Sequence, residues 1–107
     1  MENEIFDELK TELEDDPNFN EKILKVKIKN AIRDVRIRRN YKASTYSDDA
    51  IEKDMERFYV VILNVARYDY NQVGIEGEQA HSENGVNRTY VSRDSLMATV
   101  HPFVDVL

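Results

Sequence analysis

The sequence predicts a mainly α-helical protein, a small helical bundle of about four helices with one projecting β-hairpin or extended loop. Along most of residues 1–73, apolar residues recur at three- and four-residue spacing, as on one face of a helix. All three glycines, Gly74, Gly77 and Gly85, fall in one later stretch, where their backbone freedom permits turns. We therefore expect a single domain over residues 1–107.

The first two helices are expected over residues 3–15 and 20–39. The apolar stripe of the first is formed by Ile5, Leu9 and Leu13. Asn18 or Asn20 can cap the second. Its apolar face is formed by five residues at helical spacing: Leu24, Ile28, Ala31, Ile32 and Val35. Lysines and arginines occupy most of the remaining positions, so this helix is amphipathic and basic.

The third helix is expected over residues 48–72. Ser47 is a suitable N-cap, and Asp48 and Asp49 fall in the first turn, where the helix dipole favours negative charge. Its apolar residues keep helical spacing throughout: Ile51, Met55, Phe58, Tyr59, Ile62, Leu63, Ala66 and Tyr70. We expect Gly74 to cap the C-terminus of this helix in the left-handed conformation.

A hairpin or loop is expected over residues 75–91. Asn84-Gly85 suits a type I′ turn, because both central positions of that turn need φ > 0. The flanking residues are polar, and an isolated hairpin with so little apolar surface is barely stable by itself. We therefore expect the hairpin to be held by a neighbour or to stay mobile.

The chain is expected to end in a short helix over residues 93–101 and a tail over residues 102–107. Ser92 or Asp94 can cap this helix, and Pro102 disfavours its continuation because proline lacks the amide hydrogen. Its apolar residues are Leu96, Met97 and Val100. The tail is distinctly apolar, so we expect it to pack on this chain or on another.

Charge is strongly segregated along the chain, although the net charge is only −6. Residues 1–21 carry nine acids and one base, residues 22–42 carry nine bases and one acid, and the remainder is acidic. A basic middle could bind nucleic acid. It could equally bind an acidic surface on another copy of the chain, as complementary interfaces do. Composition leaves both hypotheses open.

Sequence signals for catalysis and for cofactors are absent. The chain has no cysteine and no phosphate-loop, His-Glu-x-x-His, Gly-x-Ser-x-Gly or calcium-loop motif. A zinc site would need His81, His101 and carboxylates brought together by the fold. No apolar run approaches the roughly 20 residues that span a bilayer. We expect no enzymatic activity, no metal, no cofactor and no membrane partner.

Three segments together resemble the head-tail connector (adaptor, or head completion) family of tailed bacteriophages. These are the helix end Ala66-Arg67-Tyr68-Asp69-Tyr70-Asn71, the polar stretch from Gly77 to Tyr90, and Ser95-Leu96. The family's layout is matched by Gly77, Gly85 and Tyr90. The resemblance spans residues 22–104, is specific over residues 66–96, and includes no catalytic residue. The chain departs from the family pattern in its acidic first helix and at Met97, where many relatives have proline.

The resemblance implies a structural virion protein of the phage neck, at the junction of capsid and tail, that resides in the host cytoplasm before assembly. Copies would self-associate into a ring, expected to be dodecameric. The ring would join the portal protein to the tail or to the adjacent neck or tail-completion protein. DNA would pass its central channel without sequence-specific binding.

Three groups of residues are expected to carry these contacts. Contacts between subunits, against acids of the first or third helix, are expected from Arg33, Arg36, Arg38 and Arg39. Docking of the hairpin on the portal or neck is expected from Gly77, His81, Asn84, Gly85, Arg88 and Tyr90. The apolar tail would contribute Phe103, Val104 and Leu107. The alternative hypothesis is a small nucleic-acid-binding regulatory protein that uses the basic helix, residues 22–39.

Overall fold

The computed structural model of the chain describes residues 1–41, 46–76 and 92–102. Its helices are α1 (Glu2–Leu13), α2 (Glu21–Arg39), α3 (Asp48–Glu56), α4 (Tyr59–Glu76) and α6 (Arg93–Leu96). These ranges contain five helices and no strand, so the prediction of a mainly helical fold is confirmed. The predicted hairpin or loop and tail residues 103–107 lie outside the described residues.

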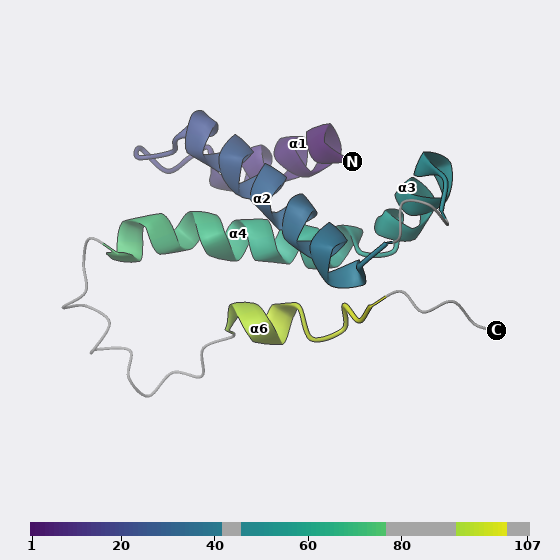
Figure 1. Cartoon of the computed structure of the whole chain (residues 1–107). Helices are drawn as coiled ribbons and strands as arrows, with labels where there is room; N and C mark the ends of the chain where they lie inside the picture. The colour runs from purple at the N-terminus through teal and green to yellow at the C-terminus, as the bar shows by residue number, and fades with distance from the viewer. Residues whose placement is uncertain (42–45, 77–91, 103–107) are drawn as a thin grey trace.

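The long helix α4 lies at the centre of the bundle (Figure 1). α2 crosses α4 on one side and makes the most extensive contact with it, and α1 packs against both of these helices. α6 lies along the opposite side of α4, and α3 lies near the C-terminal end of α2 (Figure 1). α4 is therefore covered by helices on two sides.

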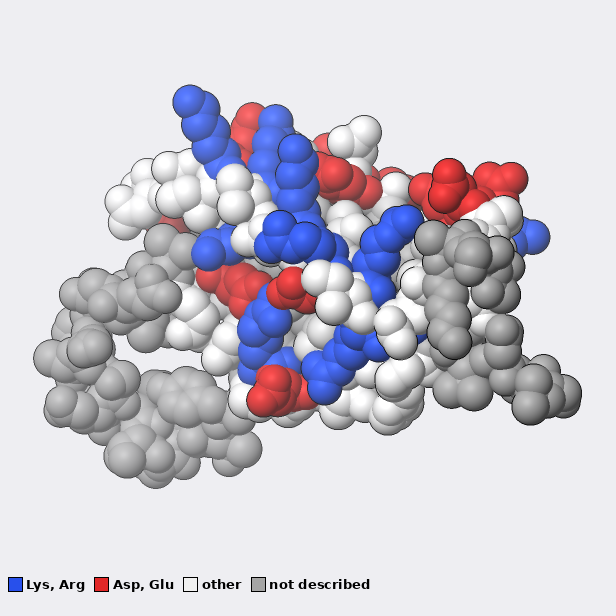
Figure 2. Space-filling view, in the orientation of Figure 1, with Lys and Arg blue, Asp and Glu red and all other residues white. Residues whose placement is uncertain are grey.

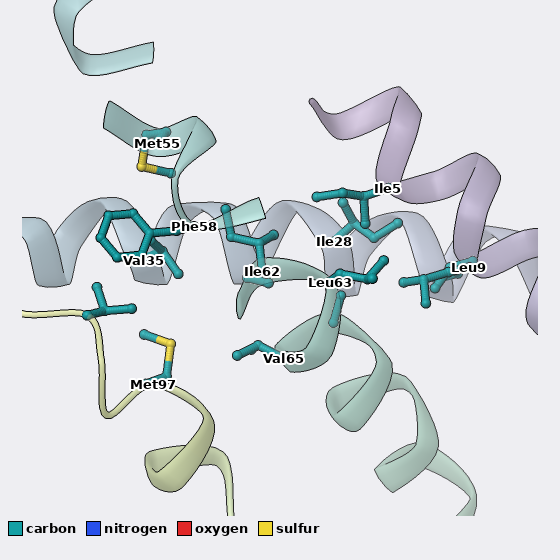
Figure 3. Packing of buried hydrophobic residues seen from close by; sticks show 14 of the residues in the cluster. Ile5, Leu9, Ile28, Val35, Met55, Phe58, Ile62, Leu63, Val65 and Met97 are labelled. Carbon is teal, nitrogen blue, oxygen red and sulfur yellow. The ribbon is translucent and has the colours of Figure 1, made fainter. Parts of the chain in front are cut away.

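One apolar core fills the space between these helices (Figure 3). Its buried residues are Ile5, Leu9, Leu24, Ile28, Ala31, Val35, Ile51, Met55, Phe58, Ile62, Leu63, Val65, Ala66, Met97 and Val100. All but Val65 lie at positions that the sequence assigned to apolar faces. Val65 is on the side of α4 that faces Met97 (Figure 3), and it is buried because α4 packs on two sides rather than one.

Side-chain caps fix where α2, α3 and α6 begin. The Oδ1 atom of Asn20 accepts a hydrogen bond from the Ile23 amide (3.0 Å), so Asn20 is the cap of α2. Ser47 Oγ accepts from the Ala50 amide (3.1 Å) and Ser92 Oγ from the Ser95 amide (3.1 Å). Each bond satisfies a helix N–H group that has no partner inside the helix.

The predicted continuous helix over residues 48–72 is two helices, and this prediction was wrong. α3 ends in a tightened turn, in which the Arg57 amide bonds the Asp54 carbonyl (3.1 Å) and the Phe58 amide bonds the Met55 carbonyl (2.9 Å). α4 begins at Tyr59. The break contains neither proline nor glycine, and such a tight turn barely changes the apolar spacing. The periodicity of the sequence therefore runs through the break unaltered.

Two further boundaries differ from the prediction. α4 continues to Glu76, so Gly74 lies inside the helix rather than capping it. α6 ends at Leu96 instead of continuing to residue 101, and the Val100 amide bonds the Met97 carbonyl (2.9 Å) in a turn. Both Met97 and Val100 are buried in the core, on either side of this turn.

The left-handed position in the described part of the chain is at an asparagine. Asn40, the C-cap of α2, has φ 55° and ψ 52°, and its amide bonds the carbonyls of Arg36 (3.2 Å) and Ile37 (3.0 Å). Asparagine tolerates this conformation better than most residues, which makes it a suitable end for a helix. The sequence predicted a positive φ at Gly74, Asn84 and Gly85, but not at Asn40.

A buried ion pair joins the end of α2 to α3. Arg39 and Asp54 are each 8% exposed. Arg39 donates from Nε to Asp54 Oδ2 (2.7 Å) and from Nη2 to Asp54 Oδ1 (2.9 Å), which is the bidentate geometry that suits guanidinium and carboxylate. Its Nη1 donates to the carbonyl oxygen of His101 (2.9 Å). One side chain thus holds α2, α3 and the segment after α6 together.

Neighbouring groups complete the environment of this pair. The Tyr41 hydroxyl and Arg57 Nη1 (3.1 Å) both donate to Asp54, and Phe58 lies against the Arg39 guanidinium, 5.0 Å from the ring centroid. Burial opposes ionisation of Asp54, but the hydrogen bonds from Tyr41 and Arg39 outweigh it and lower the pKa of this carboxyl. Burial and the bond to Asp54 raise the pKa of Tyr41 to about 12, which keeps the phenol a donor at neutral pH.

A second arginine joins α6 to two other helices. Arg93 donates from Nε to Asp69 Oδ1 (2.9 Å) on α4 and from Nη2 to Asp34 Oδ2 (2.6 Å) on α2. Arg67 on α4 makes a similar bidentate pair with Glu12 on α1, at 2.7 and 2.9 Å. Arginine side chains therefore connect all five described helices across the bundle.

Replacing Asp54 by asparagine should destabilise the protein by about 3–5 kcal/mol, because Arg39 would be left buried without its counter-charge. Urea unfolding followed by circular dichroism measures this change. The matched control is Glu52→Gln in the same helix, where the carboxylate is exposed and the change should stay within about 0.5 kcal/mol. Equal unfolding midpoints for the two variants would contradict the structural role of the buried pair.

The stability advantage of the wild type over Asp54→Asn should disappear in acid. Because the pKa of Asp54 is lower in the folded than in the unfolded protein, its contribution is fully present above the unfolded value of about 3.9. That contribution is lost as the pH falls through the folded pKa. Urea midpoints of both proteins, measured from pH 7 downward, should converge below about pH 4. A constant gap across this range would show that Asp54 ionisation does not stabilise the fold.

Candidate functional site

Basic side chains form a continuous surface along the outward side of α2. The basic face consists of Lys22, Lys25, Lys29, Arg33 and Arg36, which fall within an arc of about 80° around the helix. All five are exposed. Figure 2 shows lysine and arginine side chains gathered over α2 in the middle of this view of the molecule. Such a face is solvated in the isolated chain and can accept an acidic partner.

Most of this positive charge is not neutralised by other residues that the structure describes. Lys25 pairs with Glu21 (3.7 Å) and Arg33 approaches Asp34 (3.9 Å). In the described part of the chain, Lys22, Lys29 and Arg36 have no carboxylate within ion-pair distance.

Acidic side chains form the corresponding surface on α3. The acidic face consists of Asp48, Asp49, Glu52 and Glu56, and all four are exposed. Acidic side chains gather at the α3 end of the molecule in Figure 2. Over residues 1–41, 46–76 and 92–102, none of these carboxylates forms an ion pair. Among the described residues, the chain therefore presents two oppositely charged faces whose side chains are largely without ion-pair partners.

Several acidic side chains of α1, in contrast, have partners within the bundle. Glu12 is bound by Arg67, and Glu8 accepts a hydrogen bond from the Tyr59 hydroxyl (3.1 Å). Glu4 lies 3.4 Å from the N-terminal amine. The sequence left the first and third helices open as acidic partners of the basic helix. Because several acids of α1 already have partners, the structure favours α3.

A groove separates the two charged faces. The α1–α3 groove, about 320 Å³ in volume, is lined by Met1, Glu2, Ile32, Arg36, Glu52, Met55 and Glu56. Its apolar lining is the more buried part, since Met55 is buried and Met1 and Ile32 are half-buried. Glu52 and Glu56 are exposed at its edge. The groove combines apolar surface with a rim that carries two exposed carboxylates and the exposed guanidinium of Arg36.

The structure distributes the four arginines predicted at the subunit interface over different surroundings. Arg33 and Arg36 are exposed on the basic face. Arg38 is exposed as well, but two residues after Arg36 it lies about 200° further around the helix. Arg39 is buried and bonded to Asp54. The four side chains therefore share no single surface, and their role between subunits stays a prediction.

The other predicted contact residues lie outside the described residues. This applies to the docking residues Gly77, His81, Asn84, Gly85, Arg88 and Tyr90, and to the tail residues Phe103, Val104 and Leu107.

Two exposed aliphatic residues on α2 were missed by the sequence analysis. Ile37 is 67% exposed and Val26 is 53% exposed. They are eleven residues apart, about three helical turns, and so lie on the same side of α2 next to Arg33. The sequence signal that could have identified them is a branched aliphatic residue at a position that the amphipathic pattern of the helix assigns to its polar side.

The described ranges contain no group of three or more histidine, aspartate or glutamate side chains that could hold a metal ion. His101 is exposed, and its backbone carbonyl oxygen accepts a hydrogen bond from Arg39. His81 lies outside the described residues. Among the described helices, none has the length and apolarity that a membrane span requires.

Comparison with known proteins gives one match. No curated protein and no solved structure matches the chain. The family model described as phage gp6-like head-tail connector protein matches residues 4–102, a span that starts within α1 and ends beyond α6. This match confirms the resemblance that the sequence motifs indicated. The chain therefore belongs to the phage gp6-like head-tail connector family, a family of structural proteins of the phage neck.

Proposed function

We propose that this protein assembles into a ring in the phage neck, which joins the portal vertex of the capsid to the tail or to the next neck protein. The observation that supports this proposal is the pair of exposed faces, basic on α2 and acidic on α3, whose charges are largely without ion-pair partners among the described residues. Because these are different surfaces of one chain, pairing them between copies gives a heterologous contact. Such a contact closes into a ring when its rotation permits.

Within this ring, the contact between copies is formed by the basic face of one copy and the acidic face of the next. Arg33 and Arg36 are the arginines placed to take part, whereas Arg39 serves the fold of its own chain. Charge pairs of this kind mainly set orientation and speed of association, because exposed ion pairs contribute little affinity. Apolar contacts must supply most of the remaining affinity.

The segment 77–91 and the tail 103–107 are assigned to the portal protein and the adjacent neck protein. This segment connects α4 to α6, and Arg93 of α6 is bonded to Asp69 on α4 and to Asp34 on α2. Binding residues are often found in segments that connect well-packed elements. The family resemblance suggests twelve copies in the ring.

The channel of the ring would let DNA pass without holding it. The net charge of the chain is −6, and carboxylates repel the phosphates of DNA. Repulsion acts within a screening length of about 8 Å at physiological salt. Pairing the basic face with the acidic face of a neighbour would also remove most of the positive charge that could retain DNA.

The purified protein should co-sediment with capsids that carry a portal, and not with capsids that lack one. Failure to bind portal-bearing capsids would refute the proposed function. Binding to both kinds of capsid would show that the portal is not the partner.

Reversing charge on the basic face should weaken ring assembly. The double variant Arg33→Glu, Arg36→Glu would place like charges opposite the acidic face of the neighbour, which costs several kcal/mol, so assembly should weaken by roughly tenfold or more. Sedimentation velocity or electron microscopy measures the rings, free or on capsids. Arg38→Glu makes the same change of charge on the other flank of α2 and should have a much smaller effect. Equal effects of the two variants would contradict the assigned contact.

Binding to duplex DNA tests the alternative hypothesis of a nucleic-acid-binding regulator. A protein that held DNA through α2 would lose affinity with salt at a log–log slope of about −0.9 for each phosphate that it neutralises. For a neck ring we expect only weak, sequence-independent binding that the assembled state loses. Tight binding by the assembled ring would favour the alternative.

A further inference from the structure

We propose that the Ile37 side chain of one copy packs into the α1–α3 groove of the next copy, with Arg33 facing Glu52 and Glu56 at the groove's edge. This inference rests on the proposed self-association and names the apolar contact that it requires. The partner is a second copy of this chain, and the contact is heterologous.

Ile37 is the most exposed of the large apolar side chains in the described part of the chain, at 67%. Single exposed aliphatic residues are common on protein surfaces and indicate nothing by themselves. Ile37 differs from such residues because it lies beside the basic face, on which Lys22, Lys29 and Arg36 have no ion-pair partner among the described residues. Arg33 precedes it by one helical turn, so both side chains lie on the same side of α2.

The α1–α3 groove offers the matching chemistry. Ile32, Met55 and Met1 provide an apolar lining, and methionine adapts its shape to an inserted side chain. The volume of about 320 Å³ is roughly tenfold the share of one water molecule in the liquid, which is about 30 Å³, so the groove has room for an aliphatic side chain. The carboxylates of Glu52 and Glu56 stand at the edge, where an incoming Arg33 would meet them.

The position of these features on α2 favours contact between copies over contact within one chain. Ile32, in the groove lining, and Ile37 are five residues apart and therefore about 140° apart around the helix. The two side chains of one copy consequently point in different directions. A contact that uses two different directions of the same helix repeats from copy to copy, as a ring requires.

Disulfide trapping tests the contact directly, because the chain has no cysteine of its own. The double variant Ile37→Cys, Glu52→Cys should give a ladder of covalent multimers on oxidation, in the free protein or on portal-bearing capsids. Each single variant should give no ladder. The matched control is Val26→Cys, Glu52→Cys, since Val26 lies about 16 Å along the same side of α2 from Ile37, too far for a disulfide at the same contact.

Several outcomes would overturn this contact. These are the absence of a ladder both in solution and on capsids, an equal ladder from the Val26 control, or covalent dimers from Ile37→Cys alone, which would indicate a symmetric contact. Capsid binding without any ladder would refute the contact and leave the neck function standing. A ladder in solution without capsid binding would refute the neck function and leave the contact standing.

A second variant measures the strength of the contact without a covalent bond. Ile37→Asp should raise the protein concentration needed for half-maximal assembly by roughly tenfold or more, the amount expected for burying one large aliphatic side chain. Val26→Asp introduces the same charge on the same side of α2 and should change assembly much less. Circular dichroism should show unchanged helix content for both, since both positions are exposed. Equal effects would overturn the assignment of Ile37.

Discussion

The buried pair of Arg39 and Asp54 determines how the two ends of the bundle fit together. Transfer of both charges out of water is costly, and a buried pair is tolerated only when its remaining donors and acceptors are satisfied. Here the His101 carbonyl, the Tyr41 hydroxyl and the two carboxylate oxygens meet that requirement. No buried side-chain nitrogen or oxygen in the described ranges lacks a hydrogen-bond partner. The position of α3 against the end of α2 follows from this arrangement.

The position of α3 in turn creates the candidate site. The outward side of α3 is the acidic face. Met55 of α3 and Ile32 of α2 both line the α1–α3 groove. The apolar spacing predicted that α3 would continue straight into α4 as one helix. In that case Asp54 would lie on an uninterrupted helix, without the change of chain direction that the turn provides. The turn at Arg57 and Phe58 redirects the chain, and Phe58 packs against the Arg39 guanidinium. The fold and the candidate interface therefore share one local feature.

Arginine has two separate roles in this protein. Arg39 and Arg93 reach across the bundle to carboxylates on other helices and hold it together, while Arg33 and Arg36 point outward with little or no compensation. All four look alike in the sequence, and three of them belong to the same helix. Arg39 differs because it falls on the buried side of α2, at about the same angle as Ile28, on the last turn of the helix. Its helical position agreed with burial, although its charge indicated exposure.

The sequence by itself determined the helical class, the family, nearly the whole core and the capping residue Ser47, and it narrowed the caps of α2 and α6 to two candidates each. These depend on short-range spacing and on side-chain bonds to amides three residues away, which a linear sequence displays. Only the tertiary structure decided that Arg39 pairs with Asp54. It also decided that several acids of α1 are bonded within the bundle, whereas the acidic face of α3 forms no ion pair among the described residues. The presence of a groove beside α3, and of an exposed Ile37 on α2, was likewise decided by the packing of the helices. Helical periodicity fixes the direction of a side chain around its own axis but not what lies opposite it. Pairs such as Arg93 and Asp34, separated by 59 residues, depend on how the helices pack.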